Sequence, residues 1–247
     1  MTDSEFTSRT ARLVGDFGVA RLAASTVLIL GLGGVGGYVL EGLVRAGVGR
    51  FLLADCDVFT ESNLNRQILA TRETIGQRKT EVARERVKSI NPEASVETFD
   101  EFLDAGNIPD LFSRGEISFC VDAVDNVTAK IAAVTEATRR GIPIVTCTGT
   151  GNHLDPSRFV IGDIEKSAVC PLARVMRNEL RRRGIRGVTA LWSTEPPRKD
   201  AARNGERTPP ASVSFVPSVA GLTIAGYVVR KLAGIGDPSE IEKGVSL

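Results

Sequence analysis

Histidine is almost absent from this sequence of 247 residues, and its scarcity excludes several kinds of active site. His153 is the single histidine. One chain therefore lacks the ligands of a three-histidine metal centre and the paired histidines of a metalloprotease helix. A Ser–His–Asp or Cys–His triad would have to use His153 itself. A lone histidine is more often a structural residue than a catalyst.

Cysteine pairs and long apolar runs are lacking as well. The four cysteines are Cys56, Cys120, Cys147 and Cys170. No two of them form a C-x-x-C pair, which argues against a four-cysteine zinc site and favours reduced thiols, so we expect a cytoplasmic protein. The longest apolar stretch, 215–229, contains Pro217 and is shorter than the roughly 20 residues that span a bilayer. We expect a buried helix there, no transmembrane segment and no signal peptide.

Net charge is close to zero, at +1, which argues against a purely electrostatic nucleic-acid-binding protein. This total hides an asymmetry. Residues 1–165 contain 17 basic and 23 acidic side chains, whereas residues 166–207 contain 11 basic and 4 acidic ones, a net charge of +7. The sequence therefore combines an acidic body with a basic insert at about 166–211, and such asymmetry indicates a charged partner.

Short apolar runs alternate with segments of helical spacing between about residues 20 and 150. The runs at 26–30 and 51–54 predict buried strands, and the segment 127–140, which ends at Gly141, predicts a helix. This alternation predicts an α/β fold with a doubly wound, Rossmann-like, mainly parallel sheet.

The remaining residues are expected to extend this nucleotide-binding core within one domain over 1–247. Residues 158–164 predict an edge strand, and the polar, proline-rich segment 193–211 predicts a mobile loop. A strand at 212–215 and a helix at 217–232 are expected to form a C-terminal extension, within 212–236, that completes the sheet.

The run GLGGVG follows the first expected strand and opens a helix. Gly31 permits a tight turn, Gly33 lets a phosphate approach the backbone, and Gly36 lets helix and strand pack closely. Free N–H groups at the helix N-terminus suit a phosphate. Asp55, at the end of the second strand, can accept hydrogen bonds from ribose hydroxyls. The motif predicts an adenine-nucleotide site without specifying the nucleotide.

The segment DCDVFTESNLNRQ, residues 55–67, places polar side chains where the phosphates would lie. Arg66 can clamp a phosphate with its planar guanidinium group, and Lys79 can reach phosphates as a point charge. A redox enzyme has no need for two cations on a triphosphate tail, so this pair weakens the hypothesis of a dinucleotide oxidoreductase. Ordinary surface charge is the alternative explanation for both residues.

The sequence VDAVDN, residues 121–126, ends another apolar strand, so its carboxylates should lie at the same crevice. Asp125 is suited to hold Mg²⁺, which bridges phosphate oxygens and keeps several waters. Asp125 and Asn126 could instead serve only to cap the helix that follows.

Taken together and in order, GLGGVG, DCD with SNLNRQ, GQRK and VDAVDN resemble the ubiquitin-activating enzyme superfamily, which includes bacterial molybdopterin and thiamine adenylyltransferases. The resemblance implies that ATP and Mg²⁺ bind here, with Asp125 as the metal ligand. The implied nucleotide-binding residues are Gly31, Gly33, Gly34, Gly36, Asp55, Asp57, Asn63, Arg66, Lys79, Asp125 and Asn126. It also implies a homodimer in which an N-terminal arginine, here Arg9, reaches the partner's site. Arg9, Arg66, Lys79 and Asp125 would be catalytic.

Three further segments, TGTGNHLDP, DIEKSAVCPLA and SFVPSVAG, resemble the tRNA threonylcarbamoyladenosine dehydratase branch. That branch activates the threonyl carboxylate of N6-threonylcarbamoyladenosine in tRNA with ATP and cyclises it. Electrostatic stabilisation by cations would suffice for this chemistry, so no histidine base is needed. The alternative is an adenylyltransferase that activates the C-terminus of a ubiquitin-like sulfur carrier. Besides tRNA and the second copy of the homodimer, a cysteine desulfurase or sulfur acceptor is a candidate partner.

The basic insert gains a role under the first hypothesis. Arg174, Arg177 and Arg181 are three or four residues apart and share one helix face, where they can neutralise tRNA phosphates. A solvated helix face is the alternative. Cys170 precedes this helix, where a thiol pKa is lowered, so it is a candidate for covalent chemistry or for simple packing.

Overall fold

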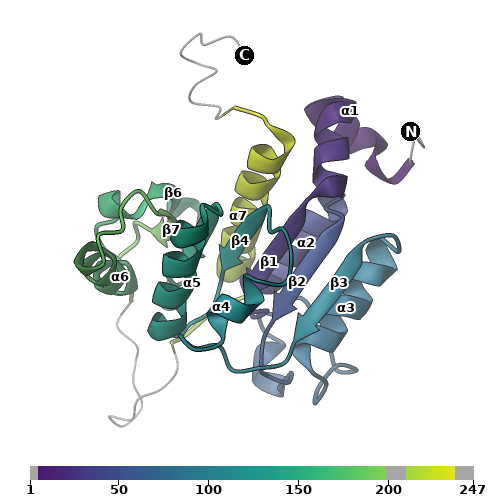
Figure 1. Cartoon of the computed structure of the whole chain (residues 1–247). Coiled ribbons are helices and arrows are strands. Elements are labelled where there is room, and N and C mark those ends of the chain that lie inside the picture. Colours follow the sequence, from purple (N-terminus) through teal and green to yellow (C-terminus); the bar gives the residue numbers. More distant parts are fainter. Residues whose placement is uncertain (1–4, 199–209, 237–247) are drawn as a thin grey trace.

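The computed structural model describes residues 5–198 and 210–236, and one β-sheet organises them (Figure 1). Its strands are β1 (Thr26–Leu30), β2 (Arg50–Ala54), β3 (Ser95–Phe99), β4 (Phe119–Asp122), β5 (Ile144–Cys147), β6 (Phe159–Asp163) and β7 (Thr189–Ser193). Its α-helices are α1 (Ser8–Ala24), α2 (Gly36–Ala46), α3 (Lys79–Ile90), α4 (Ile108–Leu111), α5 (Val127–Arg140), α6 (Pro171–Arg182) and α7 (Phe215–Ala233).

The strand order is β3-β2-β1-β4-β5-β7-β6. Every neighbouring pair is parallel except β6 with β7, which is antiparallel and places β6 at one edge. The chain thus starts near the middle of the sheet and builds outward in both directions. The prediction of a doubly wound, mainly parallel sheet with an edge strand near 158–164 is confirmed.

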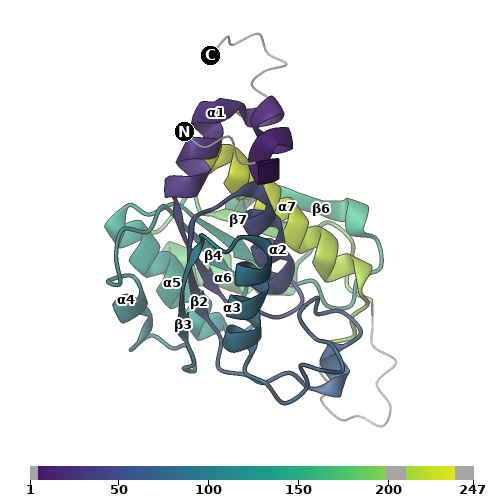
Figure 2. The same cartoon turned by 90° about the vertical axis from the view of Figure 1, so that its right-hand side faces the viewer.

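Helices cover both faces of the sheet, because successive residues of each strand point to opposite faces. Val27 and Ile29 of β1 belong to the core cluster that also contains residues of α1, α2, α3 and α7. Leu28 and Leu30 belong to the cluster that contains residues of α4 and α5. A third cluster joins α5, α6 and β7. Figures 1 and 2 show α7 running beside α2 on one face and α5 on the other.

α7 is the one described helix that is long and apolar enough to cross a membrane by length and composition. Its packing explains that composition. A Cβ on Gly221 would lie 2.5 Å from the Val35 carbonyl oxygen. A Cβ on Gly42 would lie 2.7 Å from the Cβ atom of Ala225. α2 and α7 therefore touch backbone to backbone, which makes α7 a core helix of the sheet's face.

The predicted strand at 212–215 is wrong. Residues 211–214 are outside any strand, and the chain passes directly into α7. Val213 and Ser214 turn into the helix, where the Val216 N–H donates to the Val213 carbonyl oxygen. β6 and β7, not a C-terminal strand, complete the sheet. Most of the predicted mobile loop, residues 199–209, lies outside the described residues.

Candidate functional site

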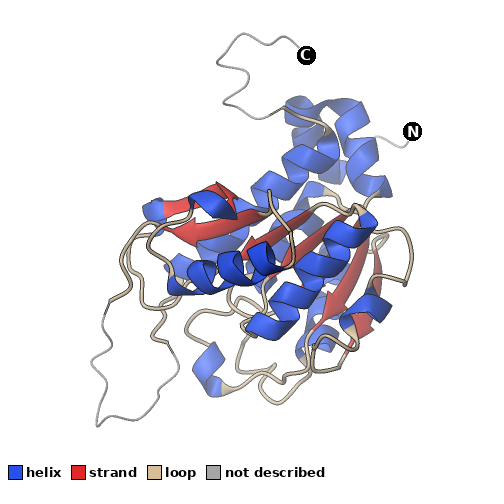
Figure 3. Ribbon diagram, turned by 60° about the vertical axis from the view of Figure 1, so that its left-hand side comes forward, coloured by secondary structure: helices blue, strands red, loops and turns tan. Residues whose placement is uncertain are grey.

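A cavity of about 910 Å³ lies where β1, β2, β4 and β5 end. This is the carboxyl edge of the parallel strands, at which open α/β sheets bind their ligands. Figure 3 shows that the loops following these strands gather at one end of the sheet. The glycine loop after β1, the polar segment after β2 and the turn after β4 all contribute to the cavity wall.

The glycine loop is held by backbone contacts that exclude side chains. Gly31 has φ +87°, and a Cβ there would lie 2.8 Å from the Ala123 carbonyl oxygen. A Cβ on Gly36 would lie 1.8 Å from the Gly31 carbonyl oxygen. Gly33 differs, because its nearest neighbour would be the Gln67 amide nitrogen at 3.9 Å. Gly33 therefore opens onto the cavity, and within the described chain no acceptor takes its N–H or that of Gly34.

Asp55 joins the glycine loop to the second strand. Its carboxylate accepts hydrogen bonds from the N–H of Leu32, at 2.7 Å, and of Asp57, at 2.9 Å. Burial raises the pKa of Asp55, against the opposing effects of Lys79 and of these two N–H groups. The carboxylate is thus fixed at the tip of β2, on the cavity wall, as a ribose-binding residue requires.

Lys79 is the buried cation of the site. Its side chain is only 6% exposed, and its Nζ atom lies 2.7 Å from Asp57 Oδ2 and 3.6 Å from Asp55 Oδ1. Asp55, Cys56 and Asp57 place three potential metal-ligand atoms within 4.8 Å of one another. The Lys79 ammonium group contacts both carboxylates of this cluster and offsets one of their two negative charges.

Asn63, Arg66 and Gln67 form the wall opposite the strands. Asn63 is buried, and its Oδ1 accepts a hydrogen bond from the Thr60 N–H. Arg66 Nη1 donates to the Ser62 carbonyl and to Asn65 Oδ1, each at 2.8 Å. Gln67 is buried with its Oε1 atom unpartnered.

The sequence analysis missed Gln67, although it follows Arg66 directly in the motif. Gln67 lines the cavity, and its buried, unpartnered Oε1 atom needs a hydrogen-bond donor. A nucleotide offers such donors in its ribose hydroxyls and its adenine amino group, so the wall fits ATP.

In the turn after β4, Asp125 and Asn126 are placed for different roles, one suited to binding a cation and the other to capping α5. Asn126 Oδ1 caps α5 by accepting hydrogen bonds from the N–H groups of Thr128 and Ala129. Asp125 is exposed, lines the cavity and has no hydrogen-bond or ion-pair partner among the described residues. The cap therefore belongs to Asn126, and the Asp125 carboxylate is available to a cation. A single carboxylate beside bound phosphates is a common Mg²⁺ arrangement.

A scan against models of known families matches residues 7–245 to the ThiF family. The chain belongs to the ThiF family. It is 39% identical over 247 aligned residues to a Bacillus subtilis protein named tRNA threonylcarbamoyladenosine dehydratase, covering 91% of this chain and 93% of that one. It is 37% identical to the Escherichia coli protein of the same name, over 75% of this chain and 72% of the relative.

Solved structures agree with this placement in the ThiF family. The Escherichia coli tRNA N6-threonylcarbamoyladenosine dehydratase in complex with ATP superimposes with a TM-score of 0.85 at 31% identity. The match covers 92% of this chain and 93% of that one. A second structure of that enzyme, in complex with AMP, gives a TM-score of 0.84. The α/β fold expected from the sequence is therefore that of an ATP-binding ThiF-family enzyme.

Most of the predicted nucleotide-binding residues of this ThiF-family chain meet at the cavity. Those among its lining residues are Gly31, Gly33, Gly34, Asp55, Asp57, Asn63, Arg66, Lys79, Asp125 and Asn126. Gly36 lies behind the wall, where it lets α2 start against the turn. Arg9 is exposed on α1 and is not among the lining residues. In Figure 1, α1 lies at the end of the molecule away from the loops of the site.

The predicted tRNA-binding arginines of α6 are less free than their spacing suggested. Arg177 donates to the Ser167 carbonyl oxygen at 2.5 Å. Arg181 pairs with Glu165, its Nε lying 2.9 Å from Glu165 Oε2. Arg174 is exposed and has no ion-pair partner among the described residues. Of the three arginines, Arg174 thus offers the most available charge.

Cys170 is buried at the N-cap of α6, and its Sγ donates to the Thr148 carbonyl oxygen at 3.1 Å. This contact favours the packing interpretation of the thiol over a covalent one. All four cysteines are free. Trp192, the aromatic residue that precedes the basic loop, is a core residue at 4% exposure.

Proposed function

We propose that the chain is an ATP-dependent tRNA threonylcarbamoyladenosine dehydratase. The observation that carries the proposal is the similarity to enzymes of that name over nearly the whole chain, 91% of it in the Bacillus subtilis relative. A partial match would support the nucleotide-binding core alone. Here the match includes the substrate side, and the cavity supplies the residues that ATP needs.

The proposed reaction removes water from N6-threonylcarbamoyladenosine at the expense of ATP. The threonyl carboxylate attacks a phosphorus atom of ATP and displaces ADP, which forms an acyl phosphate, or pyrophosphate, which forms an acyl adenylate. Either product makes one carboxylate oxygen part of a leaving group. The carbamoyl group of the same nucleoside then attacks the acyl carbon and closes a ring. The oxygen departs with the phosphate or AMP. Because the attack is intramolecular, orientation of the substrate provides much of the acceleration.

The cavity residues have distinct proposed roles. Gly33 and Gly34 offer their N–H groups to the phosphates, and Asp55 holds the ribose. Arg66, Lys79 and Asn63 stabilise the charge that develops at phosphorus. Asp125 would hold Mg²⁺, which would neutralise phosphate charge.

A homodimer completes the proposed site. Arg9 would enter the partner's cavity, since it lies outside the cavity of its own chain. The helices α1 and α7 lie against each other (Figure 2), and both expose large apolar side chains, with Leu13 86%, Phe17 76% and Leu222 49% exposed. Contact between copies along this face would cover them. We propose the cytoplasm as the compartment, in keeping with four free thiols.

Mass spectrometry of nucleosides tests the proposal. A tRNA that carries N6-threonylcarbamoyladenosine is incubated with the protein, ATP and Mg²⁺, and loss of one water from the nucleoside is expected. R66A and D125A should abolish this loss while keeping the fold. R72A and D110A are the matched controls, because both residues are exposed and outside the cavity. Full turnover by R66A or D125A would refute the assignment. Pyrophosphate exchange that requires a carrier protein would favour the adenylyltransferase instead.

A further inference from the structure

A second cavity, of about 800 Å³, opens at the opposite edge of the sheet. It lies where β4, β5 and β7 begin, whereas the nucleotide cavity lies where β4 and β5 end. The residues that build it come from elements far apart in the sequence, including the last turns of α1 and α7. Neither the proposed reaction nor the predicted site residues use it.

Cations dominate the rim of this cavity. Arg21, Arg186 and Lys231 line it, and no carboxylate is among the lining residues. All three are exposed, and none has an ion-pair partner within the described residues. Arg186 is near enough to Glu165 to lower the pKa of that carboxyl, but Glu165 is already paired with Arg181. The rim thus carries positive charge that the described protein does not neutralise.

The interior combines an aromatic ring with hydroxyl groups. Tyr227 stacks edge-to-face on Phe119, with ring centroids 6.2 Å apart, and carries Lys231 Nζ 5.6 Å from its own centroid. Its hydroxyl lies 3.5 Å from Thr189 Oγ1. Rings for stacking, hydroxyls for sugar contacts and cations for phosphate are the groups by which proteins hold individual RNA nucleotides.

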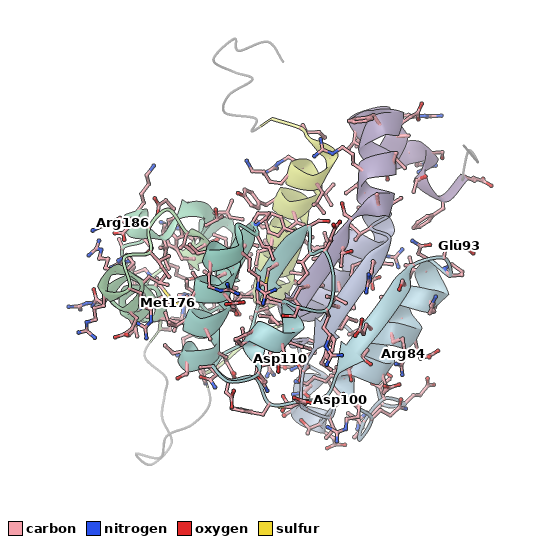
Figure 4. All side chains as sticks on the ribbon, in the orientation of Figure 1. Arg84, Glu93, Asp100, Asp110, Met176 and Arg186 are labelled. Carbon is pink, nitrogen blue, oxygen red and sulfur yellow. The ribbon has the colours of Figure 1, made fainter. Side chains whose placement is uncertain are left out.

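α6 connects the two cavities. Leu172, in its first turn, lines the nucleotide cavity, and Arg186, just beyond its end, lines the second one. Figure 4 labels Arg186 above α6, which it follows in the chain, and Met176 between α6 and α5, where it belongs to the cluster that joins them. A helix of 12 residues is about 18 Å long at 1.5 Å per residue. Roughly five to six stacked nucleotides, at about 3.4 Å each, cover that distance.

We propose that this second cavity binds a nucleotide of the tRNA substrate, several positions from the nucleotide that is modified. Arg186 and Lys231 contact its phosphates, and Tyr227 faces its base or sugar. The cavity anchors the RNA while the modified nucleoside lies beside the ATP phosphates. This inference rests on the proposed function, since it presumes a tRNA substrate.

The test compares R186A/K231A with wild type in the full chain. Binding of fluorescently labelled tRNA is followed by anisotropy from low to moderate salt. We expect the dissociation constant of the variant for tRNA to be raised on the order of tenfold. Its plot of log binding constant against log salt concentration should have a slope smaller in magnitude by about 1.4 to 1.8, because two phosphate contacts are lost. KM for tRNA should rise, while kcat and KM for ATP stay unchanged. R186K/K231R keeps both charges and should restore binding.

K88A/R114A is the matched control, since it removes two exposed cations away from both cavities. Arg21 is left intact because its guanidinium group packs on Gly234 at the α1–α7 junction. The alternative explanation is purely structural. Arg21 and Lys231 lie in the last turns of α1 and α7, where a positive charge stabilises the partial negative charge at a helix C-terminus. A lower Tm for R186A/K231A with unchanged tRNA affinity and salt slope would establish that explanation and overturn ours.

Free nucleotide binding provides a second discriminating measurement. Equilibrium dialysis with AMP should give one site per chain in both wild type and R186A/K231A. Two sites in wild type and one in the variant would mean that the cavity takes a free nucleotide, which overturns the RNA assignment. If wild type itself fails to dehydrate the tRNA nucleoside, the proposed function fails. Normal dehydration with equal tRNA binding by wild type and variant refutes only the second cavity's role.

Discussion

Lys130 and Asp122 form an ion pair that is wholly buried beneath the nucleotide cavity. Both side chains are 0% exposed, and Lys130 Nζ lies 3.0 Å from Asp122 Oδ2. Thr146 Oγ1 donates to the same oxygen at 2.5 Å, and the Val124 N–H donates to Oδ1 at 3.2 Å. The pair therefore ties β4, β5 and α5 together and holds the turn that carries Asp125.

Replacing Lys130 by methionine keeps most of the volume and removes the charge. Asp122 is then left without its cation in a site that water does not reach. Loss of one partner of a buried pair costs about 3–5 kcal/mol. In a chain of this size each kcal/mol lowers Tm by about 2–4 °C, so K130M should lose roughly 6–20 °C.

A double-mutant cycle in urea tests this reasoning. The free energy of unfolding in urea is measured for wild type, K130M, D122N and K130M/D122N, and the loss in each variant is calculated relative to wild type. Because D122N removes the orphaned charge, the double variant should be less destabilised than the sum of the singles by about 2 kcal/mol or more. K88M, an exposed lysine, should stay within about 0.5 kcal/mol of wild type. Strict additivity, or a loss below about 1 kcal/mol in K130M, would refute the account.

Three further predictions concern the glycine loop, the ion-paired carboxylate of Glu136 and the thiol of Cys170. G33A should keep wild-type stability yet bind ATP at least tenfold more weakly by calorimetry, because its Cβ has room but enters the space proposed for the phosphates. G36A should fail to fold, since its Cβ would clash with backbone. Equal Tm values for the two variants would contradict this. Arg139 and Arg140 lower the pKa of Glu136 to about 2, so Glu136 contributes stability above pH 4.5 that is lost as the pH falls toward 2. The Tm difference between wild type and E136Q should therefore vanish as the pH is lowered from 4.5 to 2. A Tm difference that stays constant would disprove the account. C170S should retain dehydratase turnover, because its hydroxyl can still donate to the Thr148 carbonyl; loss of turnover with a normal Tm would instead assign the thiol a chemical role.

Elements with strong local signals were predicted closely. α5 spans the predicted residues because Asn126 caps its start and Gly141, with φ +68°, ends it. The Rossmann-like sheet followed from buried strands that are apolar on both faces. These features depend on residues near one another in sequence, so local pattern contains them.

Features that depend on distant contacts escaped prediction. α1 was missed because Gly15 interrupts it and its buried contact, Gly18 against Ala233, joins opposite ends of the chain. The pairing of Arg181 with Glu165 could not be predicted from the sequence either, so the α6 face appeared to carry more unpaired positive charge than it does. Helical spacing shows which arginines share a face, but it does not show which acidic side chain from another element lies beside them.

The glycine loop is fixed by the protein's own backbone. The Gly31 N–H donates to the Ala54 carbonyl, the Gly37 N–H to that of Gly33, and the Leu32 N–H to Asp55. Ordering a residue costs about 1–2 kcal/mol of conformational entropy, so a flexible loop of this length would consume roughly 6–12 kcal/mol of binding energy. Folding has already met that cost here. The phosphate contacts can therefore contribute to ATP affinity almost undiminished, and ATP binding should leave the dynamics of the loop nearly unchanged.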